Sequence, residues 1–247
     1  MDSSLDTTLS NVIFLAATFA AALVTGAAGF AFGLVASAVW LYILTPLQTA
    51  TLIIWFGLIV QGYAVWKLRR PISWSRIAPL VLGAALGVPL GVIVLSSTNP
   101  HYLRAGIGAV LILYSLYGLL RPSMKPFTAG GMAADAGVGF LNGALGGATG
   151  LAGIIATIWC QVRGWPKDQQ RAVFQPVGVA TFAMSAIWLG GQGSISRDVL
   201  WLFALGLPVL LAGTWVGLKL YGKLDEAQFR KVVLVLLLAS GVVLLFR

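Results

Sequence analysis

GALGGATGLAGI, residues 143–154, holds five glycines within twelve residues. A glycine inside a helix costs roughly 0.5–1 kcal/mol relative to alanine, so a run of glycines favours an interruption of the helix. The run lies within a longer apolar segment, 134–160, which exceeds the roughly 20 residues that one membrane crossing needs. It therefore predicts a broken or re-entrant helical hairpin.

The composition places this segment in a polytopic membrane protein. Of the 247 residues, 59% are hydrophobic and 9% are charged, and the mean hydropathy is +0.92. A soluble domain carries about 25% charged residues. The net charge is +9, and the basic residues that cause it lie in short loops between apolar stretches. This distribution is typical of membrane proteins and does not indicate nucleic-acid binding. One cysteine, Cys160, and one histidine, His101, exclude a disulfide, a dithiol relay and a histidine metal site.

Eight apolar stretches follow one another along the chain. Two of them, 11–44 and 134–160, are too long for one helical crossing, and each contains a glycine run. The other six have about the length of one crossing, and they are 49–66, 76–96, 102–120, 171–190, 199–218 and 229–246. The sequence therefore predicts an all-α protein with two broken segments and six ordinary transmembrane helices.

The two glycine runs indicate an internal repeat. The matched positions are Gly26 with Gly143, Gly29 with Gly146, Gly33 with Gly150, Gly87 with Gly213, and Gly91 with Gly217. We expect one integral membrane domain made of two repeats, 1–124 and 125–247, each a glycine-rich hairpin followed by three transmembrane helices. Chance likeness between hydrophobic segments is the alternative. Weak internal symmetry is common in transporter folds.

The distribution of Lys and Arg tests this topology. If all eight stretches simply cross, the basic residues divide eight against eight. If both long stretches return to the side from which they entered, the division becomes thirteen against three, and only Arg104, Arg197 and Arg247 lie on the poorer side. The second division obeys the positive-inside rule. It strictly requires only that 134–160 returns, whereas re-entrance of 11–44 rests on its length and on the repeat.

This topology makes the two repeats inverted. Three crossings per repeat place the second repeat in the opposite orientation, so the two hairpins enter from opposite faces and meet near the middle of the bilayer. Inverted-repeat transporters hold their substrate there. We expect a multi-pass protein of a bacterial inner (plasma) membrane, with both termini on the periplasmic or outer side.

The break in each hairpin predicts an anion site. A returning half-helix that starts near 147–150 would point free N–H groups at the break, and helix N-termini attract anions. A helix interface built from small residues is the alternative explanation of the glycines. The candidate substrate-binding residues are Thr25, Gly29, Gln61, Asn142, Gly146, Gly147, Thr149, Gly150, Trp159, Arg171 and Gln175. The other tryptophans, such as Trp40, Trp188 and Trp201, are expected in the interfacial belt.

Two charged residues have open roles at this stage. Arg171 begins the sixth stretch, where it is either a cytoplasmic anchor or a residue that attracts anions to the inner mouth. Asp135 precedes the second hairpin and is an interfacial residue, a helix N-terminal cap or a proton carrier.

The pattern resembles the TauE/SafE family of sulfite exporters, also called the toluene-sulfonate uptake permease family. The resemblance covers nearly the whole chain and rests on GAAGFAFGLV (26–35), AALGVPLG (84–91), GALGGATGLAG (143–153) and LAGTWVG (211–217). It implies transport of a sulfur oxyanion or an organosulfonate, such as sulfite or sulfoacetate. Family members include exporters and importers, so the resemblance leaves the direction open.

Other classes of function compete with a transporter. A membrane enzyme would need a nucleophile, an acid–base pair or a metal cluster at membrane depth, and the sequence offers none, so we expect no catalytic residues, metal or cofactor. An anion channel of the same architecture and a non-transporting membrane assembly protein stay open. The expected partners are a small anion and the lipid bilayer, whereas a coupling proton or ion and a homo-oligomer stay open.

The predicted topology can be tested by cysteine labelling from each face of intact cells. We expect the loops containing 67–76, 121–125, 163–171 and 219–231 to be cytoplasmic. Position 168 is decisive, because only the model of simple crossings places it outside. Labelling of a cysteine at 168 by a reagent that cannot cross the membrane would contradict the re-entrant second hairpin.

Overall fold

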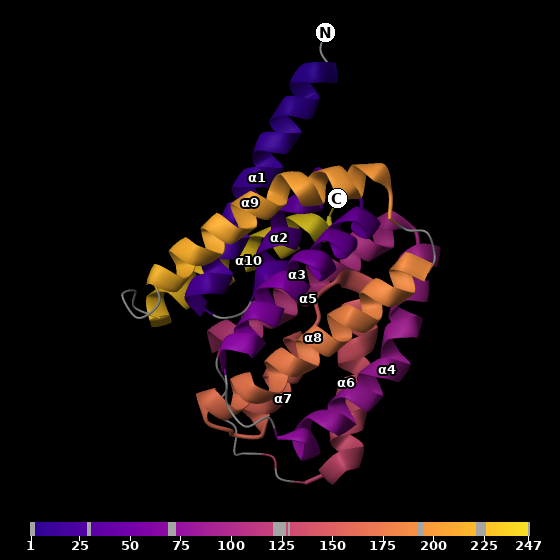
Figure 1. Ribbon diagram of the computed structural model, residues 1–247, viewed down its shortest axis with the longest axis vertical. Coiled ribbons are helices and arrows are strands. Elements are labelled where there is room, and N and C mark those ends of the chain that lie inside the picture. Colours follow the sequence, from indigo (N-terminus) through magenta and orange to yellow (C-terminus); the bar gives the residue numbers. More distant parts are fainter. Residues whose placement is uncertain are drawn as a thin grey trace. The chain divides into compact units, whose positions relative to one another are not determined.

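The computed structural model describes residues 3–28, 31–68, 73–120, 127, 129–191, 195–220 and 226–246. The regular structure in these ranges is entirely helical (Figure 1). The helices are α1 (Ser3–Ala28), α2 (Phe32–Trp40), α3 (Pro46–Leu68), α4 (Trp74–Ser97), α5 (Pro100–Leu120), α6 (Gly131–Thr149), α7 (Ile154–Val162), α8 (Lys167–Gly191), α9 (Arg197–Leu220) and α10 (Glu226–Leu245). The predicted all-α fold class is confirmed. The predicted loop segments 69–72, 121–126 and 221–225 lie outside the described residues.

Six of the described helices, α1, α3, α4, α5, α8 and α9, are long and apolar enough to cross a membrane. In α10 the described apolar part, Val233–Leu245, is shorter than one crossing. The chain is therefore a multi-pass membrane protein, as the composition predicts. Which membrane holds it, and on which side its termini lie, stay predictions.

Both long apolar stretches are broken, as predicted. Stretch 11–44 divides into α1 and α2, and stretch 134–160 divides into α6 and α7. The second break lies at Gly150–Gly153, where both glycines have positive φ (74° and 96°), a backbone conformation that other residues rarely adopt. The returning helix therefore starts at Ile154 and not near 147–150 as predicted, because Gly147 keeps its helical conformation.

Local sequence explains where α3 begins. Thr45 precedes the helix, Pro46 is its first residue, and Gln48 follows in the first turn. The Thr45 hydroxyl accepts the N–H of Gln48 at 3.2 Å, and Oε1 of Gln48 accepts the N–H of Thr45 at 3.1 Å. This reciprocal capping box satisfies two N–H groups that a helix start otherwise leaves without partners.

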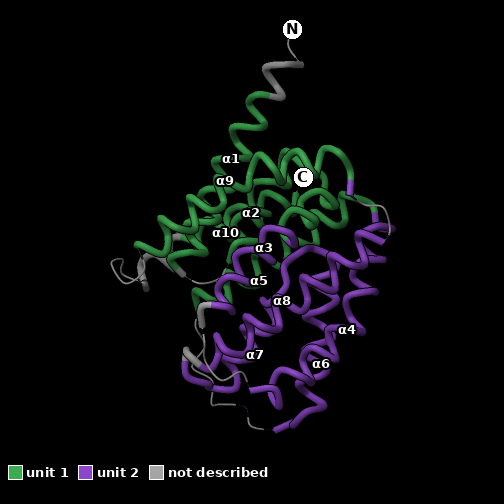
Figure 2. The backbone as a smooth tube through the Cα atoms, viewed as in Figure 1, with its two compact units in different colours: residues 1–53, 99–121, 196–247 green, residues 54–98, 122–195 purple. Residues whose placement is uncertain are grey.

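The chain forms two compact units, coloured separately in Figure 2. Unit 1 comprises 1–53, 99–121 and 196–247, and unit 2 comprises 54–98 and 122–195. Each unit contains segments from both predicted repeats. The broken helix of one repeat thus shares its unit with helices of the other repeat: α1 packs on α9 in unit 1, and α6 packs on α4 in unit 2.

In unit 2, α4 and α6 run side by side with their backbones in contact (Figure 1). Glycines at every fourth position on both helices make this approach possible, and they are Gly83, Gly87 and Gly91 on α4 and Gly139, Gly143 and Gly147 on α6. A methyl group at any of these glycines would collide with the main chain of the partner helix. The small-residue interface is therefore the observed role of Gly143 and Gly147.

In unit 1, α1 and α9 meet through equivalent glycines. The Cβ position of Gly91 on α4 meets Ala144 and Ala148 of α6, and that of Gly217 on α9 meets Leu23 and Ala27 of α1. Positions on α1 therefore correspond to positions 121 higher on α6, for example 23 to 144 and 27 to 148.

The contacts correct one detail of the sequence match. Gly26 faces the Thr214–Leu218 turn of α9 as Gly147 faces the Val88–Val92 turn of α4, so Gly26 corresponds to Gly147 and not to Gly143. The equivalence of Gly87 with Gly213 and of Gly91 with Gly217 agrees with the sequence. The shared contacts agree with the predicted repeats, but the two repeats and their inverted orientation both stay predictions.

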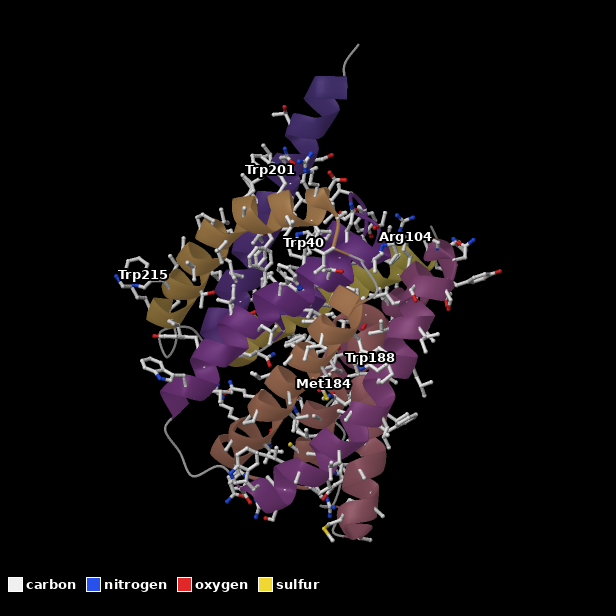
Figure 3. All side chains as sticks on the ribbon, turned by 45° about the vertical axis from the view of Figure 1, so that its right-hand side comes forward. Trp40, Arg104, Met184, Trp188, Trp201 and Trp215 are labelled. Atoms are coloured by element: carbon white, nitrogen blue, oxygen red, sulfur yellow. The ribbon has the colours of Figure 1, made fainter. Side chains whose placement is uncertain are left out.

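Exposure separates the tryptophans into two groups. Trp201 and Trp215 on α9 project from the ribbon in Figure 3, with exposed fractions of 63% and 58%, as interfacial residues should. The Nζ atom of Lys219 lies 3.5 Å from the centre of a Trp215 ring. Trp40 is fully buried, so the expectation that it belongs to the interfacial belt is wrong. Its ring instead stacks on Phe14 with 5.0 Å between centroids.

Glycine-to-alanine changes should separate packing from helix propensity. Gly91→Ala and its equivalent Gly217→Ala should each destabilise the protein by about 1–3 kcal/mol or more, because the methyl group meets backbone. Gly137→Ala, on the open side of α6, is the control and should stabilise by up to about 1 kcal/mol. Thermal unfolding in detergent measures all three. Equal effects at 91 and 137 would contradict the close approach of α4 and α6.

Candidate functional site

The start of α7 is capped from across the break by Asn142. Its Oδ1 atom accepts the N–H of Gly153 at 3.0 Å and the N–H of Ala156 at 3.3 Å, although it lies on α6. These N–H groups lie at the start of α7, where the N–H groups of a helix have no carbonyl acceptor within the helix itself. Asn142 is fully buried. The side chain therefore holds the returning helix against the middle of α6.

The turn between the two helices satisfies its own backbone. The Thr149 hydroxyl donates to the carbonyl of Leu145 at 2.7 Å and accepts the N–H of Leu151 at 3.1 Å. The N–H of Gly150 donates to the carbonyl of Gly146 at 2.8 Å. An unsatisfied backbone group costs several kcal/mol in lipid, so these bonds make a broken helix tolerable at membrane depth.

A neutral side chain, and not a carboxylate, occupies the positive end of α7. The helix dipole places about half a positive charge at an N-terminus. A carboxylate would cancel this charge, whereas the Asn142 carboxamide leaves it available. The same carboxamide donates from Nδ2 towards the Thr181 hydroxyl of α8 at 3.4 Å. The tip can therefore attract an anion and offer it donors.

Buried polar residues continue from this tip along α8. Thr181 and Ser185 lie one turn apart on the same face of the helix, Gln175 lies six residues before Thr181, and all three are buried. Gly178 lies between them and is covered by Gln61 from α3. We call Gln61, Asn142, Gln175, Thr181 and Ser185 the polar strip. Sequence reasoning missed Thr181 and Ser185, although their spacing of four residues places both on one face of a helix.

The two legs of the hairpin are joined at their base by an ion pair. Arg163 Nη2, just after α7, donates to Asp135 Oδ1 at 3.0 Å, and Trp159 Nε1 donates to the same oxygen at 2.7 Å. The Arg163 guanidinium also lies 4.8 Å from the centre of the Trp159 ring. The end of α7 therefore lies beside the start of α6, which makes the pair a hairpin. That the hairpin returns to the same side of a membrane stays a prediction.

This contact assigns a role to Asp135. The N-terminal cap position of α6 is Gly130, five residues earlier, so Asp135 does not cap the helix. Trp159, predicted to lie near the substrate, binds Asp135 at the base of the hairpin, away from the turn at Gly150–Gly153.

The first hairpin is apolar at the positions where the second is polar. Under the shift of 121, Asp135 corresponds to Phe14 and Asn142 to Ala21. Phe14 stacks on Trp40 at the base, and the Thr25 hydroxyl donates to the carbonyl of Ala21 within its own helix at 2.7 Å. Gly29 lies outside the described residues. The polar groups that could bind an anion therefore gather in the second hairpin.

The remaining predicted residues lie in two places. Gly146 faces Thr181 and Ala152 at the tip, with a virtual Cβ 2.8 Å from Thr181 Cγ2. Arg171 is partly buried in the first turns of α8. At the same end of that helix, Arg76 donates to Gln169 Oε1 at 3.0 Å and stacks over Trp165 at 4.8 Å. Arg76 was not predicted as a site residue.

Comparison with known proteins identifies a family. The sequence model of the family described as Sulfite exporter TauE/SafE matches residues 13–244. No curated protein matches the chain. No solved structure matches it.

A double-mutant cycle tests the base of the hairpin. Asp135→Asn and Arg163→Gln should each lower the thermal stability, because each leaves the other charge partly buried without its counterion. The double variant should recover about 1–2 kcal/mol relative to the sum of the single changes. Unfolding of the four proteins in detergent gives the coupling. Additive effects would show that Asp135 and Arg163 do not interact in the folded protein.

Proposed function

This chain belongs to the sulfite exporter TauE/SafE family, and from that membership we propose that it carries a sulfur oxyanion or an organosulfonate, such as sulfite or sulfoacetate, across the membrane. The family indicates a membrane transporter of the sulfite or sulfonate exporter type, and not an enzyme. The six apolar helices agree with a membrane transporter.

The neutral cap at the start of α7 is the observation that carries the proposed site. A sulfonate or sulfite group presents several acceptor oxygens and negative charge to its partners. Backbone N–H groups at a helix N-terminus suit such a group, and the Asn142 carboxamide and the Ser185 hydroxyl, which forms no hydrogen bond with the described residues, add neutral donors. In the proposed site the anion takes over the N–H groups of Gly153 and Ala156, and Asn142 turns its Nδ2 donor towards the anion.

The burial of the polar strip supports alternating access over an open pore. Asn142, Thr181 and Ser185 are fully buried, so an ion reaches them only after neighbouring helices separate. A continuously open channel would instead keep its polar lining in contact with water. In the proposal, inverted repeats expose the tip of the second hairpin first to one side of the membrane and then to the other.

The basic end of unit 2 supports a cytoplasmic mouth for this route. Arg76 at the start of α4 and Gln169 at the start of α8 are in contact, and Arg171 follows in the same turns. Arginines near a binding site raise the local concentration of anions and their rate of association. With both termini outside and the protein in a bacterial inner membrane, these residues attract the substrate from the cytoplasm.

Asn142→Asp is the sharpest test of the proposed site. An aspartate keeps the oxygen that accepts the N–H groups of Gly153 and Ala156, so the variant should stay folded. Its negative charge should neutralise the start of α7 and repel the substrate. We expect transport of labelled sulfite to fall about 100-fold, which corresponds to about 2.7 kcal/mol.

Counterflow into proteoliposomes is the measurement, because a carrier exchanges labelled for unlabelled substrate and a channel does not. Asn99→Asp is the matched control: Asn99 also accepts a backbone N–H at a helix start, that of His101 at 2.9 Å, but it is exposed. This control should transport normally. Normal transport by Asn142→Asp would show that the anion binds elsewhere.

A further inference from the structure

Gln61 occupies an unusual place in unit 2. It reaches from α3 across to α8, where its Oε1 atom touches Gly178, and a methyl group at 178 would overlap that oxygen. One turn away the roles of the two helices are reversed, because a side chain of α8 packs on a glycine of α3. The Phe182 ring lies 2.6 Å from the position that a Cβ atom of Gly57 would occupy. The glycine at 178 thus makes room for the Gln61 carboxamide.

The Oε1 atom of Gln61 is a buried acceptor without a donor. It has no solvent contact, and no hydrogen-bond donor among the described residues reaches it. Buried polar atoms almost always have a partner, and an exception indicates an absent ligand or a functional role. Ser185, two turns from Gly178 on the same face of α8, also has a buried hydroxyl that forms no hydrogen bond with the described residues.

An acceptor oxygen does not suit a fully deprotonated anion. Sulfite in its doubly charged form offers only acceptors, so a carboxamide oxygen facing it would repel it. The singly protonated form carries one hydrogen-bond donor together with its negative charge. Gln61 Oε1 can accept that hydrogen bond.

The proposed anion site lies close enough for one small ion to meet both groups. Thr181, which Asn142 contacts, follows Gly178 by three residues, a rise of about 5 Å along α8. Donors from Asn142 and the start of α7 therefore lie about one turn from the acceptor of Gln61. A tetrahedral or pyramidal oxyanion can direct its charged oxygens to the first group and its protonated oxygen to the second.

We propose that Gln61, positioned by Gly178, selects the singly protonated form of the oxyanion by accepting its proton-bearing group in a hydrogen bond. No proton is transferred in this step. The inference rests on the proposed function and deepens it, because it names the protonation state of the substrate.

The experiment compares two probes in the same proteoliposomes. Sulfite can carry a proton near neutral pH, whereas methanesulfonate is a permanent single anion without a donor. Gln61→Met keeps the length of the side chain and removes the acceptor. We expect sulfite transport to fall roughly 10-fold or more and methanesulfonate transport to stay unchanged or rise. In the wild-type protein, sulfite transport should decline with rising pH as the protonated form disappears.

Gly178→Ala supplies an independent variant, because its methyl group displaces the Gln61 carboxamide. It should lower the ratio of sulfite to methanesulfonate transport as Gln61→Met does, and it should change that ratio no further when the two are combined. Gly62→Ala is the matched control on α3, since nothing lies within 4 Å of its added methyl group. The ratio within one variant does not depend on how much protein folds.

Three outcomes would overturn the inference. An unchanged ratio in both variants would remove Gln61 from substrate selection. An equal fall in the transport of both probes would make Gln61 a hydrogen-bond donor to the anion and not an acceptor of its proton-bearing group. If neither the wild-type protein nor Gln61→Met transported sulfite or methanesulfonate, the proposed function would be overturned, and the inference with it.

Discussion

The close approach of α4 and α6 is the constraint on which the rest of unit 2 depends. Their backbones touch at three successive glycines on each helix, which leaves no room for a side chain at those positions. Lipid supplies no hydrophobic driving force between helices, so close packing of this kind is what holds a membrane helix in place. It fixes α6, and α6 in turn fixes Asn142 opposite the start of α7. The broken backbone is therefore satisfied within a rigid support.

The two hairpins share this packing but differ in chemistry. Both have a long leg on a glycine-rich partner and a nine-residue returning leg. At equivalent positions the first has Phe14 and Ala21 where the second has Asp135 and Asn142. The two predicted repeats thus share backbone contacts, while the polar groups gather in the second. This asymmetry supports a substrate site in the second hairpin, with the first as its structural counterpart.

Much of the architecture follows from the sequence, because it depends on length, hydropathy and glycine spacing. Stretches too long for one crossing are broken, and the glycines at 87, 91, 213 and 217 mark equivalent interfaces. The sequence does not predict the residue at which the second helix breaks. Gly147 is as permissive as Gly150, but it stays helical where α6 packs on the backbone of α4.

The candidate site was predictable in part, for a similar reason. Asn142, Thr149 and Gln175 stand out as polar residues in apolar stretches, and the structure brings them into one unit. Their partners do not stand out. Nothing in the sequence pairs Asp135 with Arg163, 28 positions later, or lays Gln61 on Gly178, because these contacts depend on how separate helices fold against each other.

Helices of unit 2 that meet through backbone differ from those that meet through side chains in how readily they could separate. α4 is packed at backbone distance on α6, so these two helices cannot slide or separate without breaking main-chain contacts. Within unit 2, α3 instead meets α8 through the side chains of Phe182 and Gln61, each seated on a glycine. Side chains change rotamer far more readily than two interlocked backbones separate. In the proposed transport cycle, a route to the polar strip would therefore open most readily along the contact between α3 and α8. Gln61 lies directly on that contact. A separation of α3 from α8 would therefore also move the acceptor that is proposed to bind the proton-bearing group of the substrate.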